Sequence, residues 1–410
     1  MKFLFRFVLP LLLILPGCED DAGLKNLAPT VLLISMDGFR WDYMERTNTP
    51  NLDYLVEHGV KAEALIPVFL TKTFPNHLTI VTGLYPENHG IVSNNMYDPE
   101  FDDWYYIGQG SEPVQDGRWY DGEPIWVTAA KQNQIAMTMF WPASEAEIMG
   151  LRPDEYYIYD GSIPNEDRVE QVLDWLDYPQ KKRPTFLTVY FSDLDSWGHA
   201  YGPESTEMKS AIVEMDDRIG QLLEGLQKRE MDDKVNIIIT SDHGMVQLSR
   251  DRIIFLDDYI SLDDVTIIDW SPVTAIRPDE GKADLIYDTL KDVHENFHVY
   301  KKEEMPEHLH YREHRRIPSI IGISDEGWSV TTHDQFDSQP NWYTGGGHGY
   351  DPAYKSMHGI FIAHGPAFKE GEMIEAFQNL HLYELMCHVL GLIPAENDGK
   401  LDSVLIVLRD

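Results

Sequence analysis

Cysteine is almost absent from this sequence, since only Cys18 and Cys387 occur among 410 residues. A disulfide framework therefore cannot hold the fold, which must depend on its hydrophobic core and on any bound ions. Cys387 lies in the apolar helical pattern of residues 382–390, where a cysteine is typically a buried thiol. We expect Cys387 to be buried and unpaired.

Basic residues are also scarce. The chain has 33 Lys and Arg against 69 Asp and Glu, which gives a formal net charge of −36. No Lys/Arg-rich stretch resembles a nucleic-acid-binding patch, so nucleic acid is excluded as a partner. The overall field of so acidic a protein does not attract phosphate. A phosphate-bearing substrate would need a local positive centre, and a pair of divalent cations would suffice.

The opening apolar run is too short to span a bilayer. Residues 1–17 have a short basic start followed by this run, and they predict an export signal. The run ends in Leu15-Pro16-Gly17-Cys18, which resembles the lipobox of bacterial lipoproteins. By that resemblance Cys18 would be acylated and would attach a periplasmic or cell-surface protein to a membrane; simple secretion is the alternative. Residues 18–28 are interpreted as a polar tether ahead of a catalytic domain at 29–410.

Short apolar, β-branched runs alternate with longer helical patterns along the chain. Buried parallel strands have this composition, and the alternation predicts an α/β fold with a mostly parallel central sheet flanked by helices. The expected strands are 31–35, 137–141, 185–191, 235–240 and 357–363, and the expected helices are 51–59, 125–132, 166–177, 205–227, 283–297 and 380–390.

Residues 251–341 interrupt this alternation with an aromatic and charged stretch. We interpret them as a smaller inserted subdomain or cap. The segment 308–316 contains three histidines, which raises the possibility of a metal site, but the arginines among them would repel a cation. We therefore interpret the segment 308–316 as solvated surface.

Three of the apolar strands end in carboxylates: Asp37, the pair Asp193 and Asp195, and Asp242. In open α/β sheets ligands bind at the carboxyl ends of the strands, so these side chains should converge although they are far apart in sequence. Crowded carboxylates repel one another unless a cation joins them. The pattern therefore predicts a cation site.

Histidines accompany these carboxylates. His243 follows Asp242 directly, His199 comes four residues after Asp195, and His348 lies in a glycine-rich segment. Mixed Asp and His ligation suits zinc, and open coordination positions suit catalysis. Each site taken alone has a simpler interpretation as a turn, because Asp-Gly and His-Gly are common turn sequences.

A hydroxyl, Thr73, precedes a predicted helix in which Pro75 occupies an opening position. The positive field at a helix N-terminus favours a bound phosphate and an alkoxide. Thr73 is therefore a candidate nucleophile. The alternative is an N-cap threonine without chemistry.

Longer motifs resemble the nucleotide pyrophosphatase/phosphodiesterase family of the alkaline phosphatase superfamily. They include Thr71-Lys-Thr-Phe-Pro-Asn-His, Ile80-Val-Thr-Gly-Leu-Tyr-Pro-Glu-Asn-His-Gly-Ile, Ser241-Asp-His-Gly-Met and Gly347-His-Gly-Tyr-Asp. The similarity runs from about Thr30 to the C-terminus. It implies an alkaline-phosphatase-like fold and, with the lipobox, a bacterial member that consists of the catalytic domain only.

The resemblance also implies a site. One Zn²⁺ would be held by Asp195, His199 and His348, and a second by Asp37, Asp242 and His243, with Thr73 between them as nucleophile and metal ligand. Asn94 would hold a phosphate oxygen, Phe74 and Tyr159 would stack on a nucleobase, and Trp141 would line the same pocket. The implied reaction releases nucleoside 5′-monophosphates through a covalent phosphothreonine.

Other activities fit less well. The frame Thr73-Phe-Pro-Asn-His77 lacks the oxidisable residue and the arginine of sulfatases, and the motifs lack the additional arginine or third metal of monoesterases. Two alternatives stay open: hydrolysis of choline phospholipids, since aromatic rings also suit a choline, and a non-enzymatic surface binding protein on an inherited fold.

Overall fold

The structure, a computed structural model, describes residues 28–108 and 110–409. The predicted signal segment and Cys18 lie outside these residues, as does almost all of the predicted tether, so export and lipid attachment stay predictions. Within the described residues, no helix combines the length and the apolar character that crossing a membrane requires.

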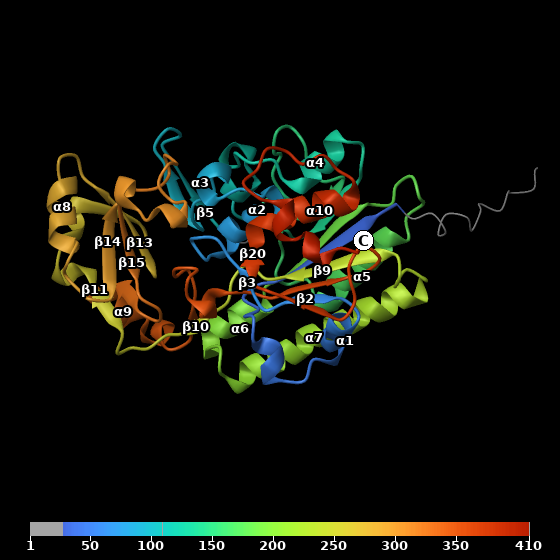
Figure 1. The fold of residues 1–410 in the computed structure, drawn as a ribbon. Helices are drawn as coiled ribbons and strands as arrows, with labels where there is room; N and C mark the ends of the chain where they lie inside the picture. Colours follow the sequence, from blue (N-terminus) through green and yellow to red (C-terminus); the bar gives the residue numbers. More distant parts are fainter. Residues whose placement is uncertain (1–27, 109, 410) are drawn as a thin grey trace, which may run out of the picture.

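An eight-stranded sheet forms the centre of the molecule (Figure 1), with the order β19-β2-β18-β9-β1-β8-β6-β7. The strands β1, β8, β9, β6 and β7 pair in parallel, whereas β18 runs antiparallel to both β9 and β2. The mostly parallel sheet is confirmed. In chain order its strands are β1 Thr30–Met36, β2 Val60–Ala62, β6 Ala136–Met139, β7 Glu155–Tyr156, β8 Phe186–Phe191, β9 Val235–Thr240, β18 Phe361–His364 and β19 Glu372–Ile374.

Both faces of this sheet are covered by helices, because the central strands carry apolar side chains on both faces. Val31 and Leu33 of β1 belong to one hydrophobic core, while Leu32 and Ile34 belong to the other. The first core contains residues of α2 (Thr73–Thr82), α4 (Ile125–Lys131) and α10 (Leu382–Leu390), and the second contains residues of α1 (Pro50–Glu57), α5 (Asn165–Leu176) and α7 (Thr206–Lys228) (Figure 1). The thiol of Cys387 on α10 is free and buried, as predicted.

Two predicted elements differ from the structure. The strand expected at 357–363 begins only at Phe361, because Lys355–Met357 forms a 3₁₀ helix before it. The helix expected at 283–297 ends at Leu290, and Phe297 already begins a strand. The remaining helices are α3 Pro86–His89, α6 Asp193–Tyr201 and α9 His333–Ser338, and the short strand pairs are β3 Leu65–Ile66 with β20 Phe377–Gln378, β4 Asn95–Asp98 with β5 Asp103–Tyr106, and β10 Val246–Gln247 with β17 Gly346–Gly347.

A second, antiparallel sheet lies at one end of the molecule (Figure 1). It has the order β12-β13-β15-β14. One face packs on α8 through Ile276 and Ile320, while Ile321 and Ile323 on the other face join the first core of the main domain. Its elements are β12 Val265–Asp269, β13 Val273–Pro278, α8 Ala283–Leu290, β14 Phe297–Lys301 and β15 Ile320–Ser324, with the pair β11 Ile253–Phe255 and β16 Ser329–Thr331 beside them.

The interpretation of residues 308–316 as solvated surface is wrong for part of the segment, since His308 and Glu313 are exposed but Leu309, Tyr311 and Arg316 are buried. Tyr311 is 2% exposed and Arg316 is fully buried. The Arg316 guanidinium donates from Nε to Asp98 Oδ2 over 2.6 Å, and from Nη1 to the carbonyl oxygens of Gly90 and Trp119. Burial of Asp98 raises its pKa, but the hydrogen bonds from Arg316 and Arg315 outweigh this and lower the pKa to about 2. The segment therefore fastens the second sheet to the main domain.

Candidate active site

The carboxyl ends of three neighbouring strands bring the predicted aspartates together. Asp37 follows β1, Asp242 follows β9, and Asp195 lies in the first turn of α6 after β8. The turn after β1 is tight: Gly38 has φ +71°, and a Cβ on it would lie 3.0 Å from the Cα of Asp195. Only glycine allows the chain to leave β1 this close to α6.

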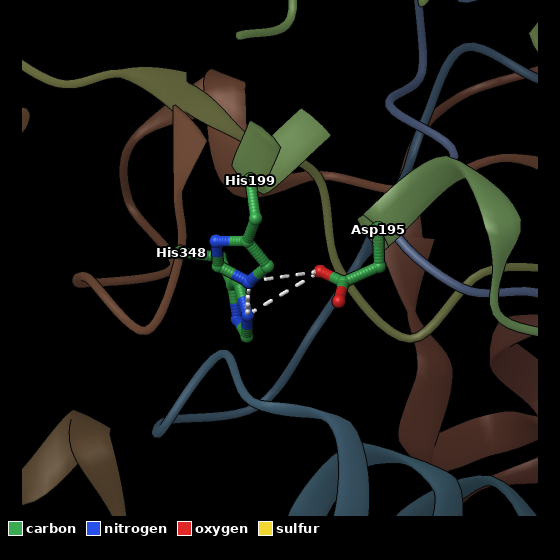
Figure 2. Close-up of side chains that lie close together, drawn as sticks. All are labelled: Asp195, His199 and His348. Carbon is green, nitrogen blue, oxygen red and sulfur yellow. Dashed lines mark hydrogen bonds and ion pairs between the residues drawn. The ribbon is translucent and has the colours of Figure 1, made fainter. Parts of the chain in front are cut away.

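Asp195, His199 and His348 form one group of candidate ligands (Figure 2). The Nε2 atoms of the two histidines lie 3.3 and 3.5 Å from Asp195 Oδ1 and 3.1 Å from each other. Each Nδ1 lies 2.9 Å from a backbone carbonyl oxygen, that of Gly346 for His199 and that of Thr71 for His348. Because a carbonyl only accepts, Nδ1 carries the proton and each Nε2 presents a lone pair to the group.

A second, more deeply buried group lies beside the first. His243 Nε2 is 3.4 Å from Asp37 Oδ1 and 3.2 Å from Asp242 Oδ2, and its Nδ1 donates to the carbonyl oxygen of Gly244. The ligand atoms of Asp37, Asp195 and His243 all lie within 4.8 Å of one another. Asp195 therefore belongs to both groups, which form one continuous cluster.

This cluster holds unsatisfied negative charge. Asp37 Oδ1, Asp195 Oδ1 and Asp242 Oδ2 are buried and have no hydrogen-bond partner. Burial, together with the neighbouring carboxylates, raises the pKa of Asp37 well above its ordinary value, and burial together with Asp195 raises the pKa of Asp242 to about 8. Buried unpaired carboxylates are costly, so the cluster fits divalent cations. The mixed carboxylate and imidazole donors suit zinc.

Thr73 lies next to this cluster as the first residue of α2. Its Oγ1 is 3.5 Å from His243 Nε2. The N-cap position is held by Lys72, so the interpretation of Thr73 as an N-cap is wrong. Asn94 lies beside it, and its Oδ1 accepts a hydrogen bond from the backbone N–H of Phe74 over 3.0 Å. The amide of Asn94 therefore has a fixed orientation at the start of α2.

A cavity of about 180 Å³ opens onto the nucleophile and the carboxylates. Asp37, Thr73 and Asp195 line it together with the aromatic side chains of Phe74, Phe140, Trp141 and Tyr159. Trp141 is fixed by a hydrogen bond from its indole N–H to the carbonyl oxygen of His77. All predicted aromatic residues of the site thus line one cavity.

Among the lining residues that were not predicted, Tyr190 and Glu145 make side-chain hydrogen bonds to predicted site residues. The Tyr190 hydroxyl donates to Asp37 Oδ2 over 2.6 Å, and a Glu145 carboxylate oxygen accepts from the backbone N–H of Tyr159 over 2.8 Å. Tyr190 could have been predicted from sequence, because a tyrosine near the end of a buried strand needs a hydrogen-bond partner for its hydroxyl. Nothing in the local pattern distinguishes Glu145 from a surface carboxylate.

A comparison with known protein families shows to which family this chain belongs. The family described as type I phosphodiesterase / nucleotide pyrophosphatase matches residues 31–351. The chain belongs to this family. Its members are enzymes, so the predicted family, fold and phosphodiesterase class are confirmed.

Individual phosphodiesterases of this family are similar over most of the chain. Human ectonucleotide pyrophosphatase/phosphodiesterase family member 5 is 40% identical over 91% of this chain and 77% of its own length. The frog (Xenopus laevis) protein named bis(5′-adenosyl)-triphosphatase enpp4 is 36% identical over 98% of this chain and 87% of its own. Mouse family member 1 is 37% identical, but the match spans 43% of that longer protein.

Solved structures agree with this relationship. Murine family member 5 superposes with a TM-score of 0.89 at 39% identity, covering 93% of this chain and all of that one. The same murine phosphodiesterase is also known as an inactive threonine-to-alanine variant in complex with AMP. These relatives are vertebrate proteins, so they give no support to the bacterial source expected from residues 15–18.

Proposed function

We propose that this phosphodiesterase hydrolyses nucleotide phosphodiester or phosphoanhydride bonds and releases nucleoside 5′-monophosphates through a covalent intermediate at Thr73. The main support is the cavity that joins Thr73 and the carboxylate cluster to the rings of Phe74 and Tyr159. When the substrate phosphate is bound beside Thr73, the nucleoside attached to it lies among these rings. Flat aromatic rings suit stacking with a nucleobase. The complex of the inactive murine relative with AMP supports a nucleotide as the substrate.

Two zinc ions complete the proposed site. Asp195, His199 and His348 would hold one, and Asp37, Asp242 and His243 the other, with Thr73 as a further ligand. When bound, these ions supply the positive charge that neutralises the phosphate and lowers the pKa of the Thr73 hydroxyl. The buried carboxylate oxygens without partners support the assignment.

The proposed reaction has two steps, in which Thr73 and Asn94 have separate roles. Thr73 Oγ1 attacks the phosphorus, the bond to the departing oxygen breaks, and the nucleoside phosphate stays on Thr73. Water attacks this phosphothreonine, and the threonine hydroxyl is regenerated as the nucleoside monophosphate leaves. Asn94 Oδ1 is occupied by the N–H of Phe74, so its amide N–H groups are available to a phosphate oxygen.

The substitution Thr73→Ala tests the nucleophile. We expect turnover to fall by about 10⁴-fold or more, because loss of a nucleophile leaves only binding and electrostatic catalysis. The matched control is Thr82→Ala at the other end of α2, where the hydroxyl donates to the carbonyl oxygen of Leu78 and accepts from the backbone N–H of Leu84, away from the cluster. A Thr73→Ala enzyme as active as the Thr82→Ala control would contradict the mechanism.

A pair of chromogenic esters tests the substrate class. Hydrolysis of the nitrophenyl ester of thymidine 5′-monophosphate is compared with hydrolysis of nitrophenyl phosphorylcholine. We expect a higher kcat/KM for the nucleotide ester, since the cavity presents several rings to a base. Preference for the choline ester would overturn the nucleotide assignment in favour of a choline-phospholipid phosphodiesterase.

We also propose that the chain is exported and attached to a membrane through acylated Cys18, with residues 1–17 removed. Relatives named as ectoenzymes and as a venom phosphodiesterase support export. Substitution Cys18→Ser tests the anchor, since it should release the enzyme from the membrane fraction. A wild-type protein found entirely in the soluble fraction would overturn the anchor and leave export by simple secretion.

A further inference from the structure

The proposed zinc ligand His348 lies in a segment with few side chains to hold it in place. Residues 345–347 and 349 are all glycines, and the pairing of β17 with β10 ends at Gly347, directly before His348. Glycine loses more conformational freedom on folding than any other residue. The segment after β17 therefore needs contacts with the rest of the molecule to keep His348 in one position.

Thr71, far away in the sequence, supplies these contacts. Its hydroxyl accepts a hydrogen bond from the N–H of Gly349 and donates one to the carbonyl oxygen of Tyr350, each over 2.9 Å. Its own carbonyl oxygen accepts from His348 Nδ1, also over 2.9 Å. Thr71 is fully buried, so no water competes for these hydrogen bonds. One residue therefore binds three successive residues of the ligand segment.

The backbone around Thr71 is in turn joined to the helix of the nucleophile. Asn76 of α2, which is also fully buried, donates from Nδ2 to the carbonyl oxygens of Leu70 and Lys72 over 2.8 and 3.0 Å. Thr71 lies between these two residues, and Lys72 is the N-cap directly before Thr73. Thr71 is thus fixed to the start of α2 on one side and to the ligand segment on the other.

The position of His348 matters for both groups of the carboxylate cluster. Its Nε2 lies 3.5 Å from Asp195 Oδ1, and its ring stacks on that of His243 with the centroids 3.6 Å apart and 11° between the planes. A rotation or shift of His348 would therefore disturb both groups. Residues that hydrogen-bond a ligand set its orientation, and so contribute to metal affinity without being ligands themselves.

We propose that Thr71 is a positioning residue that fixes His348 relative to the nucleophile Thr73. This inference rests on the proposed function, because it concerns the zinc ion that Asp195, His199 and His348 would hold. The Thr71 hydroxyl fixes the backbone of the ligand segment. Its carbonyl oxygen keeps the proton on Nδ1 of His348, so that Nε2 presents a lone pair to the ion.

Thr71→Val tests this role in zinc binding, since valine has nearly the same shape but no hydroxyl. Zn²⁺ is titrated into the metal-free full-length protein against a competing chelator. We expect two bound ions in the wild type, and in Thr71→Val we expect the affinity for one of them to fall about 10- to 100-fold. The titration uses no substrate, so its result does not depend on the nucleotide assignment.

Hydrogen exchange tests the same contact without metal. In metal-free Thr71→Val the N–H of Gly349 has lost its acceptor, and we expect the amides of residues 348–350 to exchange faster than in the metal-free wild type. Mass spectrometry of the peptide that contains these residues measures the change. Unchanged exchange in this peptide would show that the hydroxyl does not hold the segment.

Kinetics at saturating Zn²⁺ separate positioning of the ligand from binding of the substrate. For the nitrophenyl ester of thymidine 5′-monophosphate, kcat of Thr71→Val should fall about tenfold or more. KM should change by less than about twofold, because Thr71 acts on a ligand and not on the substrate. Thr71→Ser keeps the hydroxyl and should retain zinc affinity and kcat close to those of the wild type.

Thr82→Val is the matched control for the loss of a buried hydroxyl. Like Thr71, Thr82 is buried, and its hydroxyl donates to one backbone carbonyl oxygen and accepts from one backbone N–H, those of Leu78 and Leu84. Because this contact lies away from the cluster, zinc affinity and kcat should match the wild type. Thr71→Ala serves where the valine variant does not fold, since it leaves room for a water beside the unpaired N–H and carbonyl groups.

The outcomes separate this inference from the proposed function. Equal zinc affinity in Thr71→Val and Thr82→Val, or equal losses in Thr71→Val and Thr71→Ser, would overturn the positioning role of the hydroxyl while leaving the proposed function intact. A wild-type protein that binds no zinc would overturn the proposed two-zinc mechanism and the positioning role together.

Discussion

Two buried clusters of charged side chains in this molecule satisfy their charges in different ways. At the strand ends, Asp37, Asp195 and Asp242 each keep a carboxylate oxygen without a partner. At the junction with the second sheet, Asp98 is as buried as Asp37 and Asp242, but its Oδ1 accepts from Arg315 and the N–H of Glu100, and its Oδ2 from Arg316. Since unpaired buried charge is costly, the first cluster indicates a cation site and the second a structural contact.

Asp242→Asn gives the largest expected effect. Loss of a ligand should lower kcat/KM about 10³-fold or more, because metal activation contributes several kcal/mol. In the metal-free protein the same change should raise the free energy of unfolding by about 1 kcal/mol, since it removes one of several repelling carboxylates. Steady-state kinetics and denaturant unfolding in chelator measure the two effects. A destabilised metal-free variant would show that Asp242 is not under repulsion.

Arg316→Met should weaken the structural contact. It leaves the Asp98 carboxylate buried without its main partner, and we expect a loss of about 3–5 kcal/mol in the free energy of unfolding. Arg315→Met is the matched control, because Arg315 binds the same carboxylate while its side chain is 34% exposed, and its loss should stay below about 1 kcal/mol. Equal losses in urea unfolding would remove the distinction between the two arginines.

Metal removal should act on the strand-end cluster alone. Chelation is expected to abolish turnover, and Zn²⁺ at about 100 times its Kd should then raise the free energy of unfolding by about 2.7 kcal/mol. Thermal unfolding with and without Zn²⁺ measures the shift, and metal analysis of the active enzyme gives the number of ions. Arg316→Met should show the same zinc-dependent shift as the wild type. Full activity after exhaustive chelation would rule out the metal assignment.

The pH dependence of the Asp98 contact should be the smallest effect. The pKa of Asp98 in the folded protein, about 2, lies below its ordinary value of 3.8. Its ionised form therefore stabilises the fold above the ordinary pKa, and this contribution is lost as the pH falls toward 2. The difference in unfolding free energy between wild type and Asp98→Asn should be constant from about pH 7 to 5 and smaller near pH 3. A difference that changes between pH 7 and 5 would contradict this assignment.

The strand-end cluster could be predicted from the sequence because the patterns that mark it are local. An apolar run followed by a carboxylate marks each strand end, and parallel neighbours bring such ends to one edge. The prediction for Thr73 was less accurate in detail. It is the first helical residue and Lys72 is the N-cap, a difference of one position that pattern alone does not resolve.

The junction with the second sheet was not predictable in the same way. Residues 308–316 look solvated because they are charged, and the partner that buries Arg316 is Asp98, more than two hundred positions away. The strand expected at 357–363 starts late because residues 355–357 form a 3₁₀ helix, and Gly359 after that helix pairs with the distant Leu65, donating its N–H to the Leu65 carbonyl oxygen. Long-range pairing decides these cases, and no local pattern carries it.

The second sheet also has a consequence for shortening or recombining this chain. Lys72, next to the nucleophile, pairs with Asp269 of β12, while Asp98 of the main domain pairs with Arg316. Deleting the segment would leave one cation and one anion of the main domain without their counterparts, and it would strip Ile321 and Ile323 from the first core. We therefore expect a truncated enzyme to fail to fold. Exchange of this segment between relatives should succeed only when the incoming segment supplies an anion to pair with Lys72 and a cation to pair with Asp98.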